Sequence, residues 1–266
     1  MTARGSSPSQ VLKILLPLIA LAVGVAIWEA VVRVSNLPVY MLPAPSVVFS
    51  TLMQDWPILF GSLLTTLSTT VQGFVAAAVG GIGLAVLFSR SKWLEYALLP
   101  YAVILQVTPV IAIAPLLLIY LPQHVAVVVC AWIVAFFPVL SNTTLGLSSV
   151  DRNLLGLFEL YGASRAQTLR YLKLPSALPH ILGGLRIAGG LSLIGAVVAE
   201  IAAGSAGAGS GLAYRIAEAG YRLNIPRMFA ALLLLSIAGI VIYLGLSLAS
   251  YLVLRRWHES ALGKEN

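Results

Sequence analysis

The stretch "YGASRAQTLRYLKLPSALP", residues 161–179, is the least membrane-like segment in the middle of a very apolar chain. It carries three basic residues, one glycine and two prolines, and apolar runs long enough to cross a bilayer lie on both sides of it. Just before it, Asp151 is a suitable helix N-cap, and Gly162 is a suitable glycine to follow the last helical turn. A helix is therefore predicted between these two residues.

A second short helix is predicted to follow. Ser164 and Gln167 have the spacing of a capping box, in which each side chain accepts a bond from the other residue's backbone N–H. We expect this helix to end near Lys173, because Leu174 precedes Pro175 and a residue before proline avoids helical dihedral angles. A helix of about nine residues, or ~13 Å at the helical rise, is stable only when it packs against something else.

The second helix has an apolar stripe, Ala166, Leu169 and Leu172, opposite its basic residues. One interpretation is a basic loop that contacts lipid headgroups, for which charge alone is sufficient. The glycine, the capping box and the prolines instead define a shape. This favours a knob that docks on another protein.

The composition indicates an integral membrane protein. Of the 266 residues, 59% are hydrophobic and only 9% are charged, and the mean hydropathy is +0.97. A soluble core of this size would need more polar surface, so the chain is expected to lie in the lipid bilayer. The net charge of +7 is attributed to loops on the cytoplasmic side, and no nucleic-acid partner is expected.

Apolar runs of about 20 residues predict an all-α, polytopic membrane protein with about six transmembrane helices. The predicted spans are residues 14–32, 63–87, 97–121, 125–145, 181–203 and 228–254. With both termini in the cytoplasm, the only basic residues left outside are Arg33, Arg215, Arg222 and Arg227. We therefore expect one transmembrane domain over residues 14–254, cytoplasmic tails over 1–13 and 255–266, and a cytoplasmic loop over 147–180.

The spacing after Gly162 resembles that of a known family. Nine residues separate this glycine from Leu172, and Leu174 and Pro175 follow, as in the "EAA loop" of permease subunits of binding-protein-dependent ABC importers. The segments "LPAPS", "TPVIAIAPLLLIY", "FFPVLSNTTLGLSSVD" and "GSGLAYRI" are similar to the nitrate, sulfonate, taurine and bicarbonate branch of that family.

The resemblance implies a type I ABC importer permease that forms the path for a small polar solute. That solute would be a nitrate-, sulfonate- or taurine-like anion, or a heterocycle like a pyrimidine or thiamine precursor. The implied partners are two copies of a cytoplasmic ATP-binding subunit, a periplasmic binding protein and a second permease chain, most simply in a homodimer. The implied location is the bacterial inner membrane. No catalytic residue, cofactor or metal is expected, and the sequence has no G-x-x-x-x-G-K-[ST] phosphate-binding loop.

The resemblance also places the contact with the ATPase. The expected coupling residues are Glu159, Gly162, Ala163, Ser164, Arg165, Gln167, Leu172, Leu174 and Pro175. One departure is that Gly156, Leu157 and Phe158 replace the family's Glu-Ala-Ala triplet. Glu159, further along the same predicted helix, is a candidate for the missing carboxylate.

Prolines in the third span point to a route for the substrate, since irregular backbone within the membrane either lines a cavity or packs on protein. Pro109 and Pro115 are expected to break this span. The candidate path residues are Thr69, Gln72, Gln106, Thr108, Pro109, Pro115, Asn142 and Glu200. The alternative for the neutral ones is hydrogen bonding between helices.

Two carboxylates lie near the predicted outer boundary. Glu29 is expected to pair with Arg33, four residues on. Glu200 is interpreted as a carboxylate that reaches out to the interface, the alternatives being a gate or a proton-binding group. The competing function class, a secondary transporter or channel, would need charged residues at the midplane, and none is found.

Overall fold

The structure is a computed structural model that describes residues 10–204 and 209–255. All regular elements in these ranges are helical, which confirms the all-α prediction. They are α1 (Gln10–Val34), α2 (Pro45–Gln54), α3 (Trp56–Arg90), α4 (Lys92–Val107), α5 (Val110–Tyr120), α6 (Gln123–Ser148), α7 (Arg152–Leu160), α8 (Arg165–Thr168), the π-helical turn η1 (Leu169–Lys173), α9 (Leu174–Ala203), α10 (Leu212–Tyr221) and α11 (Ile225–Leu254). Most of each predicted tail, residues 1–9 and 256–266, lies outside the described residues.

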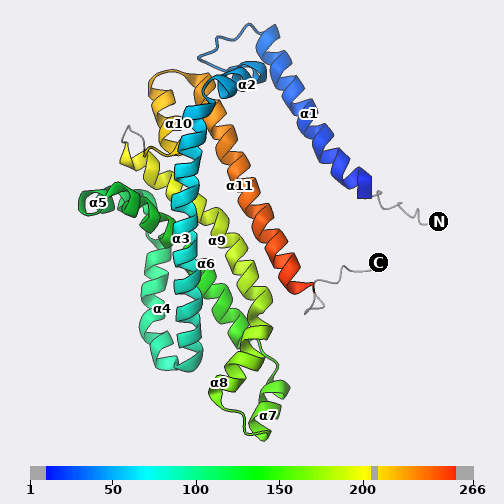
Figure 1. The fold of residues 1–266 in the computed structure, drawn as a ribbon, viewed down its shortest axis with the longest axis vertical. Coiled ribbons are helices and arrows are strands. Elements are labelled where there is room, and N and C mark those ends of the chain that lie inside the picture. The colour runs from blue at the N-terminus through cyan, green and yellow to red at the C-terminus, as the bar shows by residue number, and fades with distance from the viewer. Residues whose placement is uncertain (1–9, 205–208, 256–266) are drawn as a thin grey trace, which may run out of the picture.

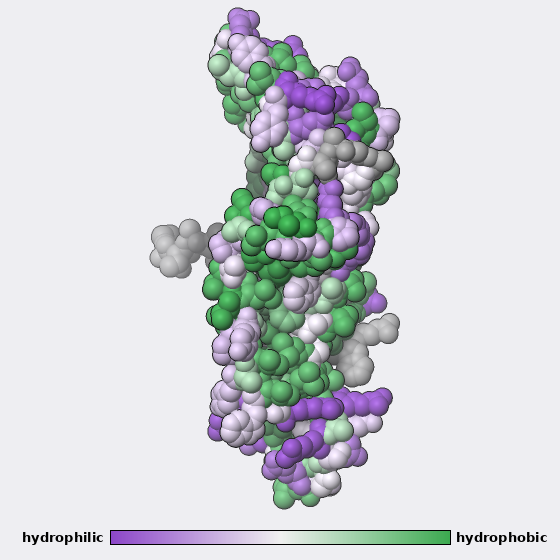
Figure 2. Space-filling view, turned by 90° about the vertical axis from the view of Figure 1, so that its left-hand side faces the viewer, coloured by the Kyte–Doolittle hydropathy of each residue, from purple (hydrophilic) through white to green (hydrophobic). Residues whose placement is uncertain are grey.

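Helices α3, α6 and α9 pack together as the centre of the bundle (Figure 1). Helix α11 packs along α9, whereas α1 lies away from the bundle and contacts it mainly through α2. Helices α2 and α10 lie at one end of the molecule, called here the α10 end, and α7 and α8 lie at the opposite end, called the α7 end. Hydrophobic residues cover the middle of the face in Figure 2, between hydrophilic residues gathered toward both ends.

Glycines bring the central helices into close contact. A Cβ atom on Gly195 of α9 would lie 2.7 Å from the carbonyl oxygen of Cys130 in α6, and one on Gly73 of α3 would lie 3.0 Å from the backbone nitrogen of Trp132. Small residues at such positions allow apolar helices to approach each other closely where burial from water gives no driving force.

Five helical segments are long and apolar enough to cross a membrane: Leu15–Val34, Trp56–Arg90, Gln123–Ser148, Arg165–Ala203 and Ile225–Leu254. Helices α4 and α5 together form a sixth candidate, but they are bent by 98°. The predicted third span over residues 97–121 therefore corresponds to this bent pair.

The bend in the third span lies at Pro109. Thr108, the residue before this proline, is extended with φ −72° and ψ 124°, as the clash with a proline ring requires. The expected break at Pro109 is confirmed. The one at Pro115 is wrong, because Pro115 lies inside α5 and the helix continues through it.

The helix that starts at Arg165 does not end near Lys173, contrary to the sequence-based prediction. It passes through η1 into α9 as one helical segment, Arg165–Ala203, and Leu174 is helical with φ −65° and ψ −46°. The backbone N–H of Leu174 bonds to the carbonyl of Leu169, five residues earlier. This wider turn directly before Pro175 relieves the clash between the proline ring and the preceding turn, so the helix continues.

Candidate functional site

The coupling segment, defined here as residues 152–173, begins with the capped helix α7. The Asp151 carboxylate accepts a hydrogen bond of 2.8 Å from the backbone N–H of Asn153, which confirms the predicted N-cap. Gly162 has φ +67°, a left-handed conformation that closes the helix, as predicted. A Cβ atom at this position would meet nothing within 4 Å. The requirement for glycine is therefore conformational and does not arise from lack of space.

The second helix starts with the predicted capping box. The backbone N–H of Gln167 donates to Ser164 Oγ at 3.3 Å, and the backbone N–H of Ser164 donates to Gln167 Oε1 at 2.7 Å. These bonds and the Gly162 turn fix the path of the chain between α7 and α8.

Apolar side chains of the coupling segment divide into an inner and an outer set. Leu169 and Leu172 are buried, as their stripe predicted, whereas Ala166 is exposed. Leu160 and Tyr161, next to the Gly162 turn, are 87% and 83% exposed. The segment thus packs on the bundle through η1 and presents an apolar turn at the tip of the α7 end.

The remaining predicted coupling residues lie around this turn. Glu159, Ala163 and Arg165 line a cavity of about 460 Å³ against the end of α3. Leu174 and Pro175 form the start of α9, where Leu174 is half-buried and Pro175 is exposed.

Glu200 lies at the α10 end and is only 3% exposed, so the interpretation as a carboxylate that reaches the interface is wrong. Its Oε2 accepts hydrogen bonds from Thr66 Oγ1 at 2.9 Å and from the backbone N–H of Ala213 at 3.1 Å. Thr66 Oγ1 in turn accepts a 2.8 Å bond from the backbone N–H of Leu212. The start of α10 covers the carboxylate, and Gly211 lies so close to it that a Cβ atom would overlap the carboxylate oxygens.

Two other predicted path residues, Thr69 and Gln72, lie near this carboxylate. A cavity of about 220 Å³ is lined by Thr65, Thr69, Gln123, His124, Val127, Glu200, Gly209 and Gly211. Gln72 lies next to it, with its Oε1 3.0 Å from His124 Nε2. Thr69, Gln72 and Glu200 therefore lie around one polar cavity, in the halves of α3 and α9 nearer the α10 end.

The other predicted path residues lie elsewhere. Thr108 Oγ1 donates to the carbonyl of Ile104 at 2.7 Å, and Asn142 Nδ2 donates to the carbonyl of Pro138 at 2.8 Å, each within its own helix or at that helix's end. Gln106, like Pro109 and Pro115, is exposed on the bent pair α4 and α5. None of these five residues lines the cavity beside Glu200.

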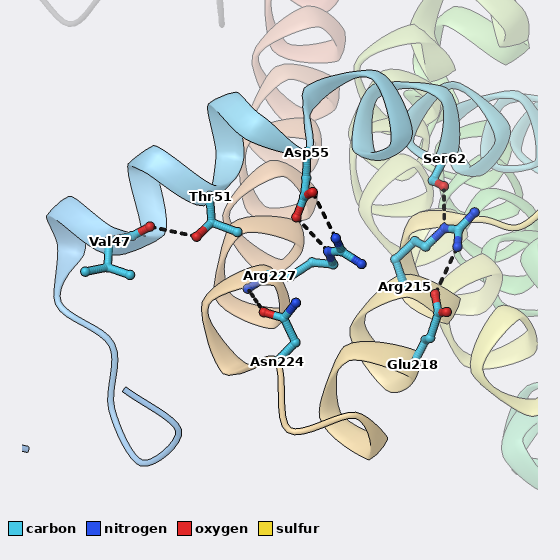
Figure 3. A network of polar contacts seen from close by, with 8 residues as sticks. All are labelled: Val47, Thr51, Asp55, Ser62, Arg215, Glu218, Asn224 and Arg227. Carbon is cyan, nitrogen blue, oxygen red and sulfur yellow. Dashed lines mark hydrogen bonds and ion pairs between the residues drawn. The ribbon is translucent and has the colours of Figure 1, made fainter. Parts of the chain in front are cut away.

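An ion pair and a hydrogen bond that sequence reasoning missed connect helices at the α10 end (Figure 3). Arg227 at the start of α11 binds Asp55 through two hydrogen bonds, of 2.6 and 2.9 Å. Arg215 of α10 binds Ser62 of α3 at 3.2 Å and Glu218 at 2.9 Å. The partners in the first pair are 172 positions apart, and no local pattern could have revealed them.

The predicted pair of Glu29 and Arg33 is confirmed, at 2.6 Å. Ser46 at the start of α2 also binds this carboxylate, through its backbone N–H at 3.0 Å and its hydroxyl at 2.8 Å. Glu29 therefore ties α1 to α2, in addition to its pairing within α1.

Residues 77–259 match the family described as the binding-protein-dependent transport system inner membrane component. The chain belongs to this family. It is 33% identical over 236 residues to the riboflavin transport system permease protein RibX of Chloroflexus aurantiacus, covering 88% of this chain and 86% of that protein. It is 35% identical over 217 residues to the formylaminopyrimidine transport permease protein ThiX of Halalkalibacterium halodurans, covering 81% and 85%.

Solved structures show the same fold. An amino acid ABC transporter chain matches with a TM-score of 0.62 at 22% identity, covering 78% of this chain and 98% of that one. A chain of the MetNI methionine ABC transporter in an inward-facing conformation matches with a TM-score of 0.65 at 18% identity, covering 77% and 99%. The type I importer permease fold expected from the sequence is confirmed.

The chain is thus a multi-pass permease subunit of an ABC importer for small solutes, as the resemblance of its sequence implied. Members of this family work with a separate ATPase subunit, which hydrolyses ATP, and with a binding protein. The alternative of a self-sufficient secondary transporter or channel finds no support.

Proposed function

We propose that the coupling segment docks on the ATPase subunit and transmits its movement to α9. The observation that carries this proposal is the exposed apolar turn at Leu160 and Tyr161, set between two capped helices. Because η1 continues directly into α9, a displacement of the turn acts on a helix that reaches the Glu200 cavity at the other end. Glu159, Ala163, Ser164, Arg165 and Gln167 are the further residues proposed for this contact.

The proposal includes the orientation. The α7 end is cytoplasmic, as are residues 1–13, 255–266 and the loop over 147–180, and residues 14–254 form the permease domain. The excess of basic residues at this end and in the tails supports this orientation.

A site-directed photo-crosslink tests docking and orientation together. The chain has a single cysteine, Cys130, so Cys130→Ala provides a background for single labels. A photo-crosslinker on Leu160→Cys is expected to form an adduct with the ATPase. The matched control is Tyr221→Cys at the α10 end, whose side chain is 90% exposed. An ATPase adduct from position 221 and none from 160 would reverse the orientation and refute the docking site.

We propose further that the permease acts as a homodimer with two ATPase subunits, since each chain offers one coupling segment. The mass of the purified, transport-competent complex tests this. One permease chain per two ATPases would contradict it.

The substrate proposed is a small nitrogen heterocycle. The support is the 33% and 35% identity to permeases named for riboflavin and formylaminopyrimidine. A sulfonate- or nitrate-like anion is the second candidate, supported by 30% and 29% identity to permeases named for aliphatic sulfonates and nitrate. Uptake of labelled riboflavin, formylaminopyrimidine, ethanesulfonate and nitrate by cells that express the complete importer decides between the two classes.

A further inference from the structure

A second feature of the α7 end is a basic cavity that the docking proposal does not require. The cavity of about 460 Å³ between the end of α3 and the coupling segment is lined by three cations, Arg90, Arg165 and Lys173, and one carboxylate, Glu159. Within residues 10–204 and 209–255, none of these three cations forms an ion pair. The cavity therefore has an excess of two positive charges without a protein counter-charge.

The depth of this cavity is indicated by its neighbours. Arg90 is the last residue of the membrane-crossing helix α3, and Lys173 directly precedes α9. Trp93 and Tyr96, in the first turns of α4, are 85% and 73% exposed. Exposed tryptophan and tyrosine at the ends of apolar helices are typical of the boundary between headgroups and acyl chains. The cavity thus lies at the level of the lipid headgroups.

We propose that this cavity binds the phosphate group of an anionic phospholipid. Arginine and lysine side chains are the usual protein donors to phosphate, and the volume lies within the range of about 300–1,000 Å³ found for ligand sites. Basic pockets beside transmembrane helices on the cytoplasmic side bind anionic headgroups in this way. A free phosphate would find the same donors, but the position at headgroup depth favours the lipid.

The exposed apolar surface of α4 offers a place for the acyl chains of such a lipid. Leu98, Tyr101 and Ile104 of this helix are exposed beyond the aromatic residues that mark the boundary. A bound lipid would contact α3 through Arg90 and the coupling segment through Lys173. The lipid would thus join a fixed helix of the bundle to the segment that meets the ATPase.

The test measures binding of dioleoylphosphatidylglycerol to the purified full-length chain by native mass spectrometry, with dioleoylphosphatidylcholine and inorganic phosphate as comparison ligands. The double variant Arg90→Gln/Lys173→Gln removes two lining charges and leaves the proposed ATPase contact Arg165 in place. Binding of phosphatidylglycerol is expected to weaken on the order of thirty-fold, from about 1 kcal/mol for each basic residue near an anionic headgroup.

The matched control is Arg152→Gln/Arg170→Gln, which removes the same charge from the same end outside the cavity. It is expected to bind phosphatidylglycerol within about twofold of the unmodified chain, because neither side chain lines the site. If the double variant does not fold, Arg90→Gln alone replaces it, with an expected loss of about fivefold.

Three outcomes would overturn the proposal. Equal weakening in the test and control variants would mean general attraction to a basic surface. Competition by millimolar inorganic phosphate would assign the cavity to a soluble anion. If the test variant lost ATPase co-purification but bound phosphatidylglycerol as before, the cavity would belong to the docking surface.

Discussion

The two ends of the bundle are held together in different ways. At the α10 end, polar bonds join residues far apart in the sequence: Thr66 to Glu200 across 134 positions and Arg227 to Asp55 across 172. At the α7 end, the polar bonds of the coupling segment are local, such as the pair of Ser164 and Gln167, three positions apart. Helix α7 has no buried residue.

From this difference we expect the α10 end to be rigid and the coupling segment to move as a unit. For the α10 end to change shape, the bonds between its helices must break together. The buried polar groups would then have no water to replace their lost partners. The local bonds of the coupling segment survive when the segment moves as a unit. Stability is therefore expected to depend on the α10 end, and transmission of movement on the shape of the α7 end.

The largest expected effect follows from removing the buried carboxylate at the α10 end. Glu200→Ala leaves the backbone N–H of Ala213 without an acceptor and removes a partner of Thr66. A loss of about 3 kcal/mol in unfolding free energy is expected, from unpaired buried groups and the space left behind. Thermal unfolding of the full chain in detergent, followed by tryptophan fluorescence, measures it.

Glu200→Gln is the matched control, because its amide oxygen can replace Oε2 as the acceptor. Its loss is expected to be less than half that of Glu200→Ala. Equal losses in the two variants would show that the hydrogen bonds at Oε2 do not hold the α10 end.

A smaller effect is expected from the ion pair between α11 and the start of α3. A double-mutant cycle with Asp55→Ala and Arg227→Ala is expected to give a coupling free energy of about 1–2 kcal/mol, since the pair is doubly hydrogen-bonded and mostly shielded from water. The cycle of Glu29 and Arg33, where the arginine side chain is 69% exposed, is the comparison and should give less than about 1 kcal/mol. A coupling free energy no larger than that of the exposed pair would show that the bond between Asp55 and Arg227 does not stabilise this end.

The same difference explains how much the sequence predicted. The caps at Asp151 and Ser164 were predicted because each partner lies two or three positions away, within reach of a pattern. The burial of Glu200 was not predicted, since it depends on Thr66 in α3 and on the fold of α10 over the end of α9. Such contacts arise only when distant helices are already in place.

The passage of the helix through Pro175 shows a second limit of sequence reasoning. The rule for residues before proline is a statistical preference, and here the wider turn of η1 lets the helix continue through Pro175. At Thr108 and Pro109 the same rule holds, and the chain bends by 98°. Local sequence thus indicated breaks at Pro109, Pro115 and Pro175, but the helix continues through the last two and breaks only at the first.

The smallest expected change in stability, with a large effect on transport, concerns Gly162. Its φ of +67° is strained for a β-branched residue, at a cost of about 1 kcal/mol or more, whereas asparagine tolerates this region. Gly162→Val is therefore expected to reduce ATPase association and uptake while unfolding of the bundle changes little, because the local bonds of α7 contribute little to the core. Gly162→Asn is the matched control and should keep both activities, since no neighbouring atom lies within 4 Å of an added Cβ.

A variant that removes charge from the same segment is compared with the Gly162 variant, which changes its shape. Arg170 is exposed and lies over its neighbour Tyr171 at 5.7 Å from the ring centroid, so Arg170→Gln removes a contact of about 0.5–1 kcal/mol without changing the backbone. If shape couples the permease to its ATPase, co-purification should fall in Gly162→Val and persist in Arg170→Gln. If charge couples them, the order is reversed. That reversal, with Gly162→Val fully active in uptake, would refute the role assigned to the exposed turn, because the valine variant alters only the geometry of that turn.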